Sequence, residues 1–417
     1  MKKKIYSCMD DYDPNSILVE DALKKIEKLA KKIDSYEYVS LEQSYNRVVF
    51  ENIKSKFKVP NYNNSAMDGY ALNIKYFKNG EKKFKVIGTA LAGLPFKGRI
   101  KKNECIKIMT GAVLPKDCNI VIMKEEVDDV DNTNIKINSK NVKLNQNIRF
   151  AGEDIKPNKV IIKKFHVINS SSMGLLASQG IHRIKVFKKP VVSFFTSGDE
   201  VVSINKKLSF GKVYDSNRFT LYGMLKKLDV NIIDLGHAED NKKDIKNKFN
   251  NAIKKSDIVI STGGVSVGDA DYIKDVVRSL GNINFWKVAV KPGRPLAFGR
   301  IKDTVFFGLP GNPVSVMITF LLFVLPAVCR LSNKEHELKT ENAILKSNLK
   351  KRKGRAEFQR GILLSKNNKN YVTTVGEQGS GILSSMNDAN CLIYLPFDKG
   401  ASKKDDIVKI IKFKDYI

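Results

Sequence analysis

Glycine-bearing loops directly follow three apolar runs in the second half of the chain. They are Ser197-Gly198-Asp199-Glu200, the stretch from Thr262 to Asp269, and the stretch from Gly308 to Pro313. Glycine lets backbone N–H groups approach a ligand closely, and the N–H groups that begin a helix favour anions. Three such loops in one segment favour a ligand cleft over chance turns by about three to one. None matches the P-loop or the Rossmann fingerprint, so ordinary ATPase and NAD-binding chemistry lose support.

Carboxylates accompany these loops, although they would repel an anionic ligand. Asp199 and Glu200 follow the apolar run 190–195, Asp240 follows the run 230–235, and Asp269 and Asp271 follow the run 257–260. A hard cation that bridges carboxylate and phosphate oxygens reconciles the two charges, and Mg²⁺ is the usual choice. An Asp just before a helix is also a common N-cap, so for Asp199 and Asp269 the cap and the functional role weigh equally. Glu200 and Asp271 are less natural caps, which favours a functional role for them.

A segment near residue 290 concentrates three cations and the single Trp of the chain. If it is extended, Lys287 and Lys291 lie on one face of the strand. Pro292 and Pro295 then stiffen the turn that presents Arg294. Arg recognises an oxyanion through two parallel hydrogen bonds, which Lys does not supply. This arrangement suits a phosphate or another oxyanion.

Short polar loops in the first half of the chain are further candidates. Residues 63–71 form a dense run of small and polar side chains, and similar stretches cover 109–112 and 151–154. Composition alone weighs a tight structural turn and a functional loop equally. All three stretches precede the glycine-bearing loops in the sequence. A single site that used both sets would therefore lie between domains or between two subunits of a dimer.

The glycine-bearing loops need a sheet to hold them, and residues 189–331 have the pattern of one. Apolar runs alternate there with helical patterns of 10–15 residues, which indicates parallel βαβ units in a doubly wound sheet. The predicted strands are 190–195, 230–235, 257–260, 283–290 and 304–307, and the predicted helices are 216–228, 242–255, 272–280 and a last one from 313. Ligands bind beyond the carboxyl ends of such strands, where the three loops fall.

The remaining segments suggest three further domains. Helical patterns cover 16–35, 40–49 and 170–178, whereas residues 59–147 read as short strands between turn signals. The predicted fold class is therefore α/β multidomain, with a doubly wound, mostly parallel α/β domain. The predicted domains are a helical or mixed N-terminal domain (1–58 plus 155–187), an inserted β-rich domain (59–154), the α/β domain (188–331) and a small C-terminal β domain (332–417).

The charge balance is unusual for a globular chain. Its 417 residues include 73 Lys plus Arg against 44 Asp plus Glu, a formal net charge of +29. That charge invites a nucleic-acid-binding or membrane-surface interpretation. The lysines, however, occur in every segment and often near Asp or Glu, whereas a nucleic-acid surface would cluster them with aromatic residues. We therefore expect mostly solvated lysines and no nucleic-acid partner.

Cysteine usage and hydropathy indicate the cellular setting. The five cysteines form no C-x-x-C pair, which favours a reducing compartment. The basic start is followed by acidic residues rather than an apolar run, unlike a secretory signal. The most apolar stretch, Val314 to Cys329, is short for a bilayer span and is interrupted by Pro326, so we expect a buried helix. We expect a cytoplasmic protein with no membrane partner.

Taken in order, these motifs resemble those of the MoeA-type molybdopterin molybdenumtransferase family, which includes the E domain of gephyrin. The matching stretches run in family order over nearly the whole chain. They are Asn64 to Ala71, Ile108 to Ala112, Arg149 to Ile155, Gly198 to Glu200, Tyr214 to Arg218, Gly263 to Tyr272, Lys287 to Pro295, Leu309 to Ser315 and Phe358 to Gly361. The resemblance implies a homodimer whose active site combines the α/β domain of one subunit with the β-rich insertion of the other.

The reaction implied by the resemblance is insertion of molybdate into adenylylated molybdopterin, with Mg²⁺ assisting cleavage of the pyrophosphate link and release of AMP. The implied pathway partners are molybdopterin adenylyltransferase and molybdoenzymes. The resemblance assigns the catalytic roles to Asp68, Thr110 and Asp154 on the partner-facing side, to Glu200, Asp240 and Asp271 (Glu200 and Asp271 as metal ligands), and to Lys287 and Lys291. It assigns substrate binding to Ser65, Asp199, Asp215, Asn217, Gly263, Gly264, Ser266, Arg294, Pro310, Gly311, Asn312, Ser315, Arg360 and Ser380.

Two alternative functions remain beside this one. Molybdopterin adenylyltransferases share a similar α/β domain, but they are much shorter and typically carry Gly-Gly-Thr-Gly where this chain has Gly263-Gly264-Val265-Ser266. The β-rich insertion that bears Asp68 also argues against that family. The second alternative, a basic nucleic-acid-binding protein without enzymatic activity, rests on the net charge alone.

Overall fold

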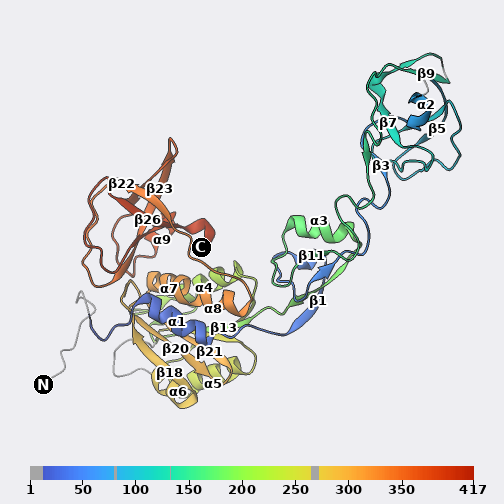
Figure 1. Cartoon of the computed structure of the whole chain (residues 1–417). Coiled ribbons are helices and arrows are strands. Elements are labelled where there is room, and N and C mark those ends of the chain that lie inside the picture. Colours follow the sequence, from blue (N-terminus) through green and yellow to red (C-terminus); the bar gives the residue numbers. More distant parts are fainter. Residues whose placement is uncertain (1–12, 79–81, 132, 264–271) are drawn as a thin grey trace. The chain divides into compact units, whose positions relative to one another are not determined.

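The computed structural model describes residues 13–78, 82–131, 133–263 and 272–417 (Figure 1). The chain divides into two compact units. The larger unit takes in Met1–Glu37, Asn46–Val48 and Val186–Ile417, and the smaller unit takes in Tyr38–Tyr45 and Val49–Lys185. This division is coarser than the four predicted domains, whose boundaries stay a prediction.

The larger unit is built on a six-stranded sheet. Its strands, in spatial order, are β16 (Asn231–Ala238), β13 (Val191–Ser197), β17 (Ile258–Thr262), β21 (Thr304–Leu309), β20 (Pro295–Ile301) and β18 (Asn282–Lys287). The first four are parallel, and β20 and β18 are antiparallel to their neighbours. The predicted mostly parallel α/β sheet is confirmed.

Helices cover both faces of this sheet, because successive strand side chains point to opposite faces. On β13, Val192 and Phe194 belong to one hydrophobic core and Phe195 to the other. Helices α1 (Val19–Leu29), α4 (Ser216–Lys226), α7 (Pro313–Thr319) and α8 (Leu325–Leu331) cover the first face, and α5 (Lys242–Ile253) and α6 (Tyr272–Leu280) cover the second (Figure 1). Helix α1, which its sequence position suggested for an N-terminal domain, thus packs on the α/β sheet through Ala22 and Ile26.

The most apolar stretch of the chain is a helical run from Pro313 to Leu331. Its 19 residues are long enough and apolar enough to cross a membrane, with a mean hydropathy of 2.3, so the expectation that it is too short is wrong. However, 83% of the apolar part of this helical run is buried inside the protein, as expected of a core helix. A π-helical segment, η3 (Phe320–Val324), precedes Pro326, which has no N–H to continue the α-helical bonding.

The C-terminal part of the larger unit is a small β-barrel, as predicted for a β tail. Its strands are β22 (Glu341–Leu345), β23 (Ala356–Lys366), β24 (Lys369–Thr374), β25 (Cys391–Leu395) and β26 (Ile407–Lys412), with the two-residue β19 (Val290–Lys291) added beside β23. Pairing of β23 with β25 closes the ring. Its interior is a separate apolar core that includes Leu345, Val372 and Ile393. The short helix α9 (Ser384–Asp388) lies before β25 in the chain.

The smaller unit is β-rich, as predicted. Its six-stranded sheet has the order β7 (Ile120–Met123), β4 (Gly69–Leu72), β6 (Glu104–Ile108), β5 (Lys83–Ala90), β9 (Asn134–Ile137) and β8 (Val127–Asp129). Two short antiparallel pairs join β3 (Asn64–Ser65) to β10 (Ile148–Arg149) and β2 (Ile53–Lys54) to β11 (Val160–Ile162).

Two helical predictions for the N-terminal half had opposite outcomes. Helix α3 (Ser170–Ser178) is confirmed at its predicted bounds. The helix predicted over 40–49 is wrong, since only the single turn η1 (Glu42–Ser44) forms there. Asn46 has a positive φ of 63°, a backbone conformation that ends a right-handed helix.

Candidate functional site

A cavity of about 660 Å³ lies at the carboxyl ends of β13, β17 and β21 in the larger unit. The loop after each of these strands contributes to its wall, as a doubly wound sheet predicts. Seven of the predicted site residues line it: Glu200, Asp215, Asn217, Gly263, Pro310, Gly311 and Asn312. Lining residues that the predictions did not include are Val201, Val213, Tyr214, Ser216, Pro295, Pro313 and Gly381.

Gly263 is required by the sheet itself. It has a φ of 84°, and a Cβ added there would lie 2.6 Å from the Ser197 carbonyl oxygen of the neighbouring strand. A larger residue would therefore collide with the backbone of β13. The glycine allows two strand ends to lie close together beneath the cavity. Its predicted partners Gly264 and Ser266 lie outside the described residues, as does Asp271.

The start of helix α4 ties the cavity wall together. Asp215 caps the helix by accepting a hydrogen bond from the Arg218 N–H at 3.0 Å, and it accepts a second from the Thr196 hydroxyl at 2.5 Å. Asn217 donates from its amide to the Gly311 carbonyl oxygen at 2.7 Å. Asp215 is 4% exposed, so its two bonds are shielded from water. These contacts link α4 to β13 and to the loop after β21.

His237 is a half-buried residue at this site that the sequence did not reveal. Its Nδ1 lies 3.4 Å from the Thr196 hydroxyl oxygen. Because Thr196 donates its own proton to Asp215, this oxygen can only accept from the imidazole, which assigns the proton to Nδ1. Burial lowers the pKa of His237, against the opposing influence of Asp215. A lone His near the end of a strand has no spacing pattern that could have identified it.

The predicted carboxylates Asp199, Glu200 and Asp240 lie close enough to repel one another. Burial raises the pKa of Asp240, and the negative charges of Asp199 and Glu200 raise it further. No Lys or Arg in the described part of the chain forms an ion pair with any of the three. Within residues 13–78, 82–131, 133–263 and 272–417, no three His, Cys, Asp or Glu residues are arranged to hold a metal ion by themselves.

The predicted cations are paired with carboxylates of the protein and do not line the cavity. The Lys287 amino group lies 3.3 Å from the Asp13 carboxylate, and the Arg294 guanidinium donates to the same oxygen. Although burial raises the pKa of Asp13, its bonds to the Asn15 N–H, Lys287 and Arg294 outweigh this and lower it. Asp13 lies 281 residues before Arg294, and no local pattern connects them.

Lys291 has its own internal partner. Its amino group lies 3.1 Å from the Glu357 carboxylate, which is 6% exposed. The strands bring the two together, since β19 pairs in parallel with β23 and sets Lys291 opposite Glu357. Glu357 was not predicted, because it lies in a different strand far along the chain. The three cations therefore meet carboxylates of the protein before they meet any ligand.

The C-terminal predictions fall into two groups. Ser380 reaches the cavity wall, since its hydroxyl accepts a hydrogen bond from the Asn312 amide at 2.9 Å. Ser315 and Arg360 are buried at 3% and 1% exposure and do not line the cavity. The structure thus joins Ser380 to Asn312 in the cavity wall, whereas the side chains of Ser315 and Arg360 lie outside that wall.

The smaller unit presents one oriented carboxylate. Asp68 accepts hydrogen bonds from the Thr110 N–H and the Thr110 hydroxyl, both at 2.7 Å. These bonds lower the pKa of Asp68, which is exposed. The nearby Ser65 is buried and donates to the Met67 carbonyl oxygen at 2.5 Å, so it shapes the loop. Asp154 is exposed, and its N–H donates to the Val59 carbonyl oxygen at 3.1 Å. Val59 shortly precedes the loop that bears Ser65 and Asp68, so this bond ties Asp154 to the start of that loop.

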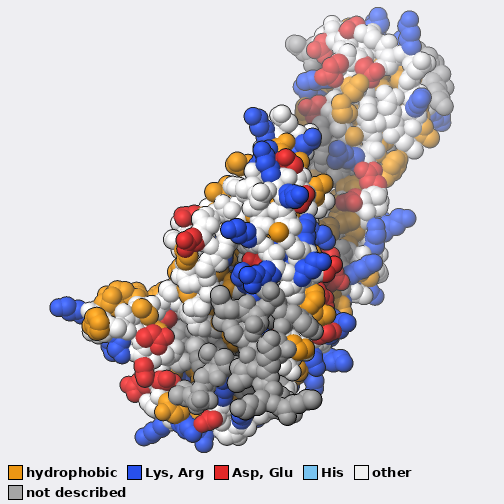
Figure 2. Space-filling view, turned by 90° about the vertical axis from the view of Figure 1, so that its left-hand side faces the viewer, with side chains coloured by type: hydrophobic (Ala, Val, Ile, Leu, Met, Phe, Trp, Pro, Cys, Tyr) orange, Lys and Arg blue, Asp and Glu red, His pale blue; other side chains and the backbone are white. Residues whose placement is uncertain are grey.

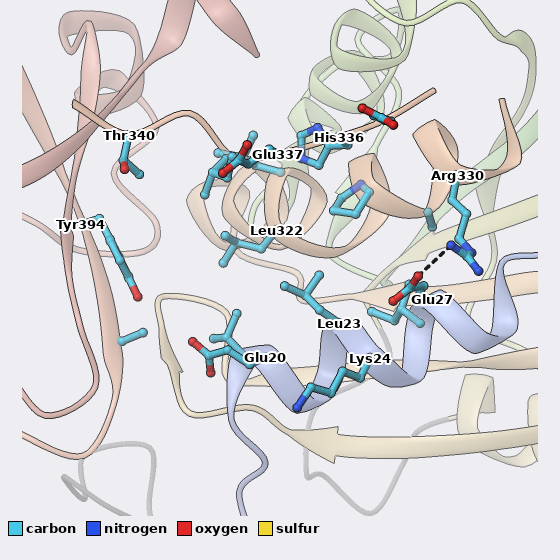
Figure 3. A pocket seen from close by; sticks show the side chains of 18 of the residues that line it. Glu20, Leu23, Lys24, Glu27, Leu322, Arg330, His336, Glu337, Thr340 and Tyr394 are labelled. Atoms are coloured by element: carbon cyan, nitrogen blue, oxygen red, sulfur yellow. Dashed lines mark hydrogen bonds and ion pairs between the residues drawn. The ribbon is translucent and has the colours of Figure 1, made fainter. Parts of the chain in front are cut away.

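A second cavity, of about 790 Å³, has no residue of the predicted site in its wall. Figure 3 shows it between α1, α8 and the barrel, with Leu23 and Leu322 among its apolar side chains. Glu27 and Arg330 form an ion pair of 2.7 Å at one end of it. Tyr394 faces it from the barrel. It is separate from the cavity that the sequence motifs line.

The positive charge is dispersed on the part of the surface that can be followed in Figure 2. Lys and Arg side chains lie there among Asp, Glu and apolar side chains instead of forming one continuous patch. A dispersed charge agrees with solvated lysines and gives no support to a nucleic-acid surface.

Comparison with protein families accounts for most of the chain. The profile described as "MoeA N-terminal region (domain I and II)" matches residues 17–180, and the "Probable molybdopterin binding domain" matches residues 194–330. The "MoeA C-terminal region (domain IV)" matches residues 342–413. The three matches follow one another without overlap.

Individual proteins resemble the chain over almost its full length. A molybdopterin molybdenumtransferase of Haemophilus influenzae is 39% identical over 90% of this chain and 94% of its own length. Gephyrin of Dictyostelium discoideum is 30% identical over 95% of this chain and 62% of its own length. The crystal structure of a molybdopterin biosynthesis MoeA protein from Pyrococcus horikoshii OT3 superposes with a TM-score of 0.80 at 28% identity, covering 95% of this chain and all of that one.

Proposed function

This chain belongs to the MoeA-type family of molybdopterin molybdenumtransferases, enzymes of molybdenum cofactor biosynthesis, and from that premise we propose that it inserts molybdate into adenylylated molybdopterin and releases AMP. The observation that carries the proposal is the cavity at the carboxyl ends of β13, β17 and β21, where seven motif residues meet. A doubly wound sheet binds its ligand at this edge.

The composition of the cavity wall supports a particular orientation of the substrate. Among the described residues that line it, none is Lys or Arg, and Tyr214, Pro295 and Pro310 supply flat apolar surfaces. Such a wall suits a ring system better than a phosphate. We therefore assign the cavity to a heterocyclic part of the substrate. Molybdate or phosphate would lie toward Lys287, Lys291 and Arg294.

We propose that Mg²⁺ binds beside the carboxylates of the site, of which Glu200 lines the cavity. Burial raises the pKa of Asp240, and the negative charges of Asp199 and Glu200, which a divalent cation would offset, raise it further. We propose Glu200 as a ligand, completed by Asp271 beyond the described residues, with Asp240 beside them. When bound there, Mg²⁺ supplies positive charge that offsets the charge of the phosphate oxygens.

The residues of the chain then have distinct tasks in the reaction. Asp215 and Asn217 fix the start of α4, so that the cavity keeps its shape when the substrate binds. As water or a molybdate oxygen attacks the molybdopterin phosphorus, the P–O bond to AMP breaks, and Lys287, Lys291 and Arg294 stabilise the negative charge that develops on the departing AMP. Fixed charges of this kind lower the barrier because they need no rearrangement during the reaction. AMP and the molybdenum cofactor are the products.

We also propose that the chain acts as a homodimer in the cytoplasm. In this arrangement Asp68, Thr110 and Asp154 serve the site of a second copy. The support is the orientation of Asp68, an exposed carboxylate held by two hydrogen bonds to Thr110. A mixture of Asp68→Ala and Asp271→Asn chains should regain part of the activity that each lacks alone. A mixture as inactive as its components would contradict the shared site.

The reaction is tested by incubating the purified protein with adenylylated molybdopterin and following AMP by chromatography. We expect AMP release that requires both molybdate and Mg²⁺, and that falls at least about tenfold in Glu200→Gln because a charged ligand is lost. Glu27→Gln, which lies in the wall of the second cavity and not in that of the proposed site, is the matched control and should behave as wild type.

Two outcomes would contradict the proposed reaction. One is release of AMP at the same rate without molybdate, which would indicate simple hydrolysis. The other is formation of adenylylated molybdopterin from molybdopterin and ATP by this chain alone, which would indicate an adenylyltransferase.

A further inference from the structure

The buried guanidinium of Arg360 donates to three successive carbonyl oxygens of one loop and to a hydroxyl of helix α9. Arg360 lies on β23, is 1% exposed, and is the largest fully buried side chain of the described residues. Its Nη1 donates to the Gln378 carbonyl oxygen at 3.1 Å, and its Nη2 donates to those of Glu377 and Gly379 at 3.2 and 2.8 Å. Its Nε donates to the Ser385 hydroxyl at 3.0 Å. Three successive carbonyls thus converge on one planar cation.

The backbone of Arg360 reinforces the same loop. Its N–H donates to the Gln378 side-chain oxygen at 2.7 Å, and its carbonyl oxygen accepts from the Gln378 amide at 3.2 Å. The Gln378 amide also donates to the Val375 carbonyl oxygen at 2.7 Å. The segment 377–379 is therefore fastened to β23 at both its main chain and a side chain. A point charge such as Lys could not reproduce three carbonyl contacts in one plane.

The next residue of this loop holds the beginning of helix α7. The Ser380 carbonyl oxygen accepts the Val314 N–H at 3.2 Å, and its hydroxyl accepts from the Asn312 amide at 2.9 Å. Asn312 is the N-cap of α7 but makes no side-chain capping bond within its own helix. The first free N–H of α7 is therefore satisfied by the C-terminal loop, because Pro313 has none to offer.

The same loop borders the cavity. Gly381 lines it directly, beside Gly311 and Asn312. Arg360 itself does not reach the cavity wall. Any influence of its side chain on the site must pass through residues 377–381.

We propose that Arg360 is a positioning residue: it fixes the 377–381 loop, which through Ser380 sets Asn312 and the first turn of α7 at the wall of the substrate cavity. The role goes beyond the substrate contact that family resemblance suggests for this residue. It rests on the proposed function only where the cavity is taken as the substrate site.

Amide hydrogen exchange on the free protein tests the structural step without any substrate. In Arg360→Lys we expect exchange of the Val314 N–H and of residues 377–383 to be about tenfold faster, because local opening costs less free energy. Gln378→Ala should give the same change, since it loosens the loop while leaving the guanidinium in place. Arg47→Lys is the matched control: Arg47 is 4% exposed and donates to the Phe187 carbonyl oxygen, far from this loop in the sequence.

Three results decide the proposal. Faster exchange at Val314 in Arg360→Lys and Gln378→Ala, with Arg47→Lys unchanged there, supports it. Wild-type exchange at Val314 in both variants overturns it. If Arg360→Lys does not fold, Gln378→Ala alone decides in the same way.

The kinetic step has its own readout. Displacing a cavity wall should raise KM for adenylylated molybdopterin about tenfold in Arg360→Lys while kcat changes by less than about threefold. A fall in kcat with unaltered exchange at Val314 would instead indicate direct action on the reacting groups, and would overturn the positioning role. If exchange at Val314 is faster in the two variants as expected, but even the wild-type protein releases no AMP, the result counts against the proposed function and not against the positioning role.

Discussion

The carboxylates at the cavity edge and the cations of the 287–294 segment are organised in opposite ways. Asp199, Glu200 and Asp240 have no ion-pair partner among the described residues, and burial together with the charges of Asp199 and Glu200 raises the pKa of Asp240. Lys287 and Arg294 share Asp13, and Lys291 faces Glu357. One group holds unrelieved charge of one sign, and the other has most of its charge already neutralised.

This difference separates a site that awaits a ligand charge from one that is assembled without it. Repelling carboxylates are costly and persist in a fold when a bound cation repays the cost. Paired cations need no ligand to be stable, but their positions are fixed in advance, which favours recognition of a planar or tetrahedral anion. Removal of charges from either group tests this difference.

The largest expected effect comes from the carboxylate that two cations share. Asp13→Asn leaves Lys287 and the buried Arg294 without the negative charge that they share. Because hydrogen bonds to charged groups contribute about 1.5–3 kcal/mol each, we expect the free energy of unfolding to fall by about 2 kcal/mol. Denaturant unfolding measures it. Glu27→Gln, which breaks an exposed pair with Arg330, should cost at most about 1 kcal/mol. Equal losses in the two variants would show that the Asp13 cluster is not special.

The next effect concerns the affinity of the basic segment for anions. Glu357→Gln removes the carboxylate that faces Lys291 and leaves its amino group available. We expect molybdate to bind about threefold more tightly at low salt, with the gain fading at high salt as charges are screened. Calorimetric titration of the protein with molybdate measures the change. Weaker binding would mean that Glu357 positions Lys291 rather than competing for it.

A smaller effect is expected from relieving the repulsion among the carboxylates. A raised pKa means that Asp240 keeps its proton to a higher pH in the folded protein than in the unfolded chain. Its contribution to stability is therefore lost as the pH rises above the ordinary carboxyl value of 3.8. At neutral pH, Asp240→Asn should stabilise the metal-free protein by a few tenths of a kcal/mol, since the group is partly exposed. Thermal unfolding at pH 4 and pH 7 should show the gain only at pH 7, and added Mg²⁺ should narrow it.

The smallest effect lies in the smaller unit, where a carboxylate is held without a cation. Thr110→Val removes the hydroxyl donor to Asp68 but leaves the Thr110 backbone N–H bond. The pKa of Asp68, lowered by these bonds, should move up toward its ordinary value. Titration of the Asp68 carboxyl carbon by NMR measures the shift. An unchanged pKa would show that the backbone bond alone sets it.

The parts of the site that follow strand ends could be predicted from the sequence, whereas the parts that depend on distant pairing could not. Apolar runs followed by glycine-bearing loops mark the ends of β13, β17 and β21, and residues from all three loops meet at the cavity. Asp13 and Glu357 have no such mark, because their partners lie in other elements. The helix expected over 40–49 fails for a different reason. The spacing of its apolar residues is helical, but Asn46 has a positive φ, which ends any right-handed helix there.

The packing of helix α1 has a consequence for the order in which the protein is made. Residues 19–29 leave the ribosome early, but the strand β20, against which α1 packs, begins at Pro295. At 5–20 residues per second, synthesis of the intervening chain takes about 13–53 s. The smaller unit is complete by then, whereas the apolar stripe of α1 has nothing to cover it. The first helix to be synthesised is among the last to be buried, and it is the stretch of nascent chain that we expect chaperones to hold.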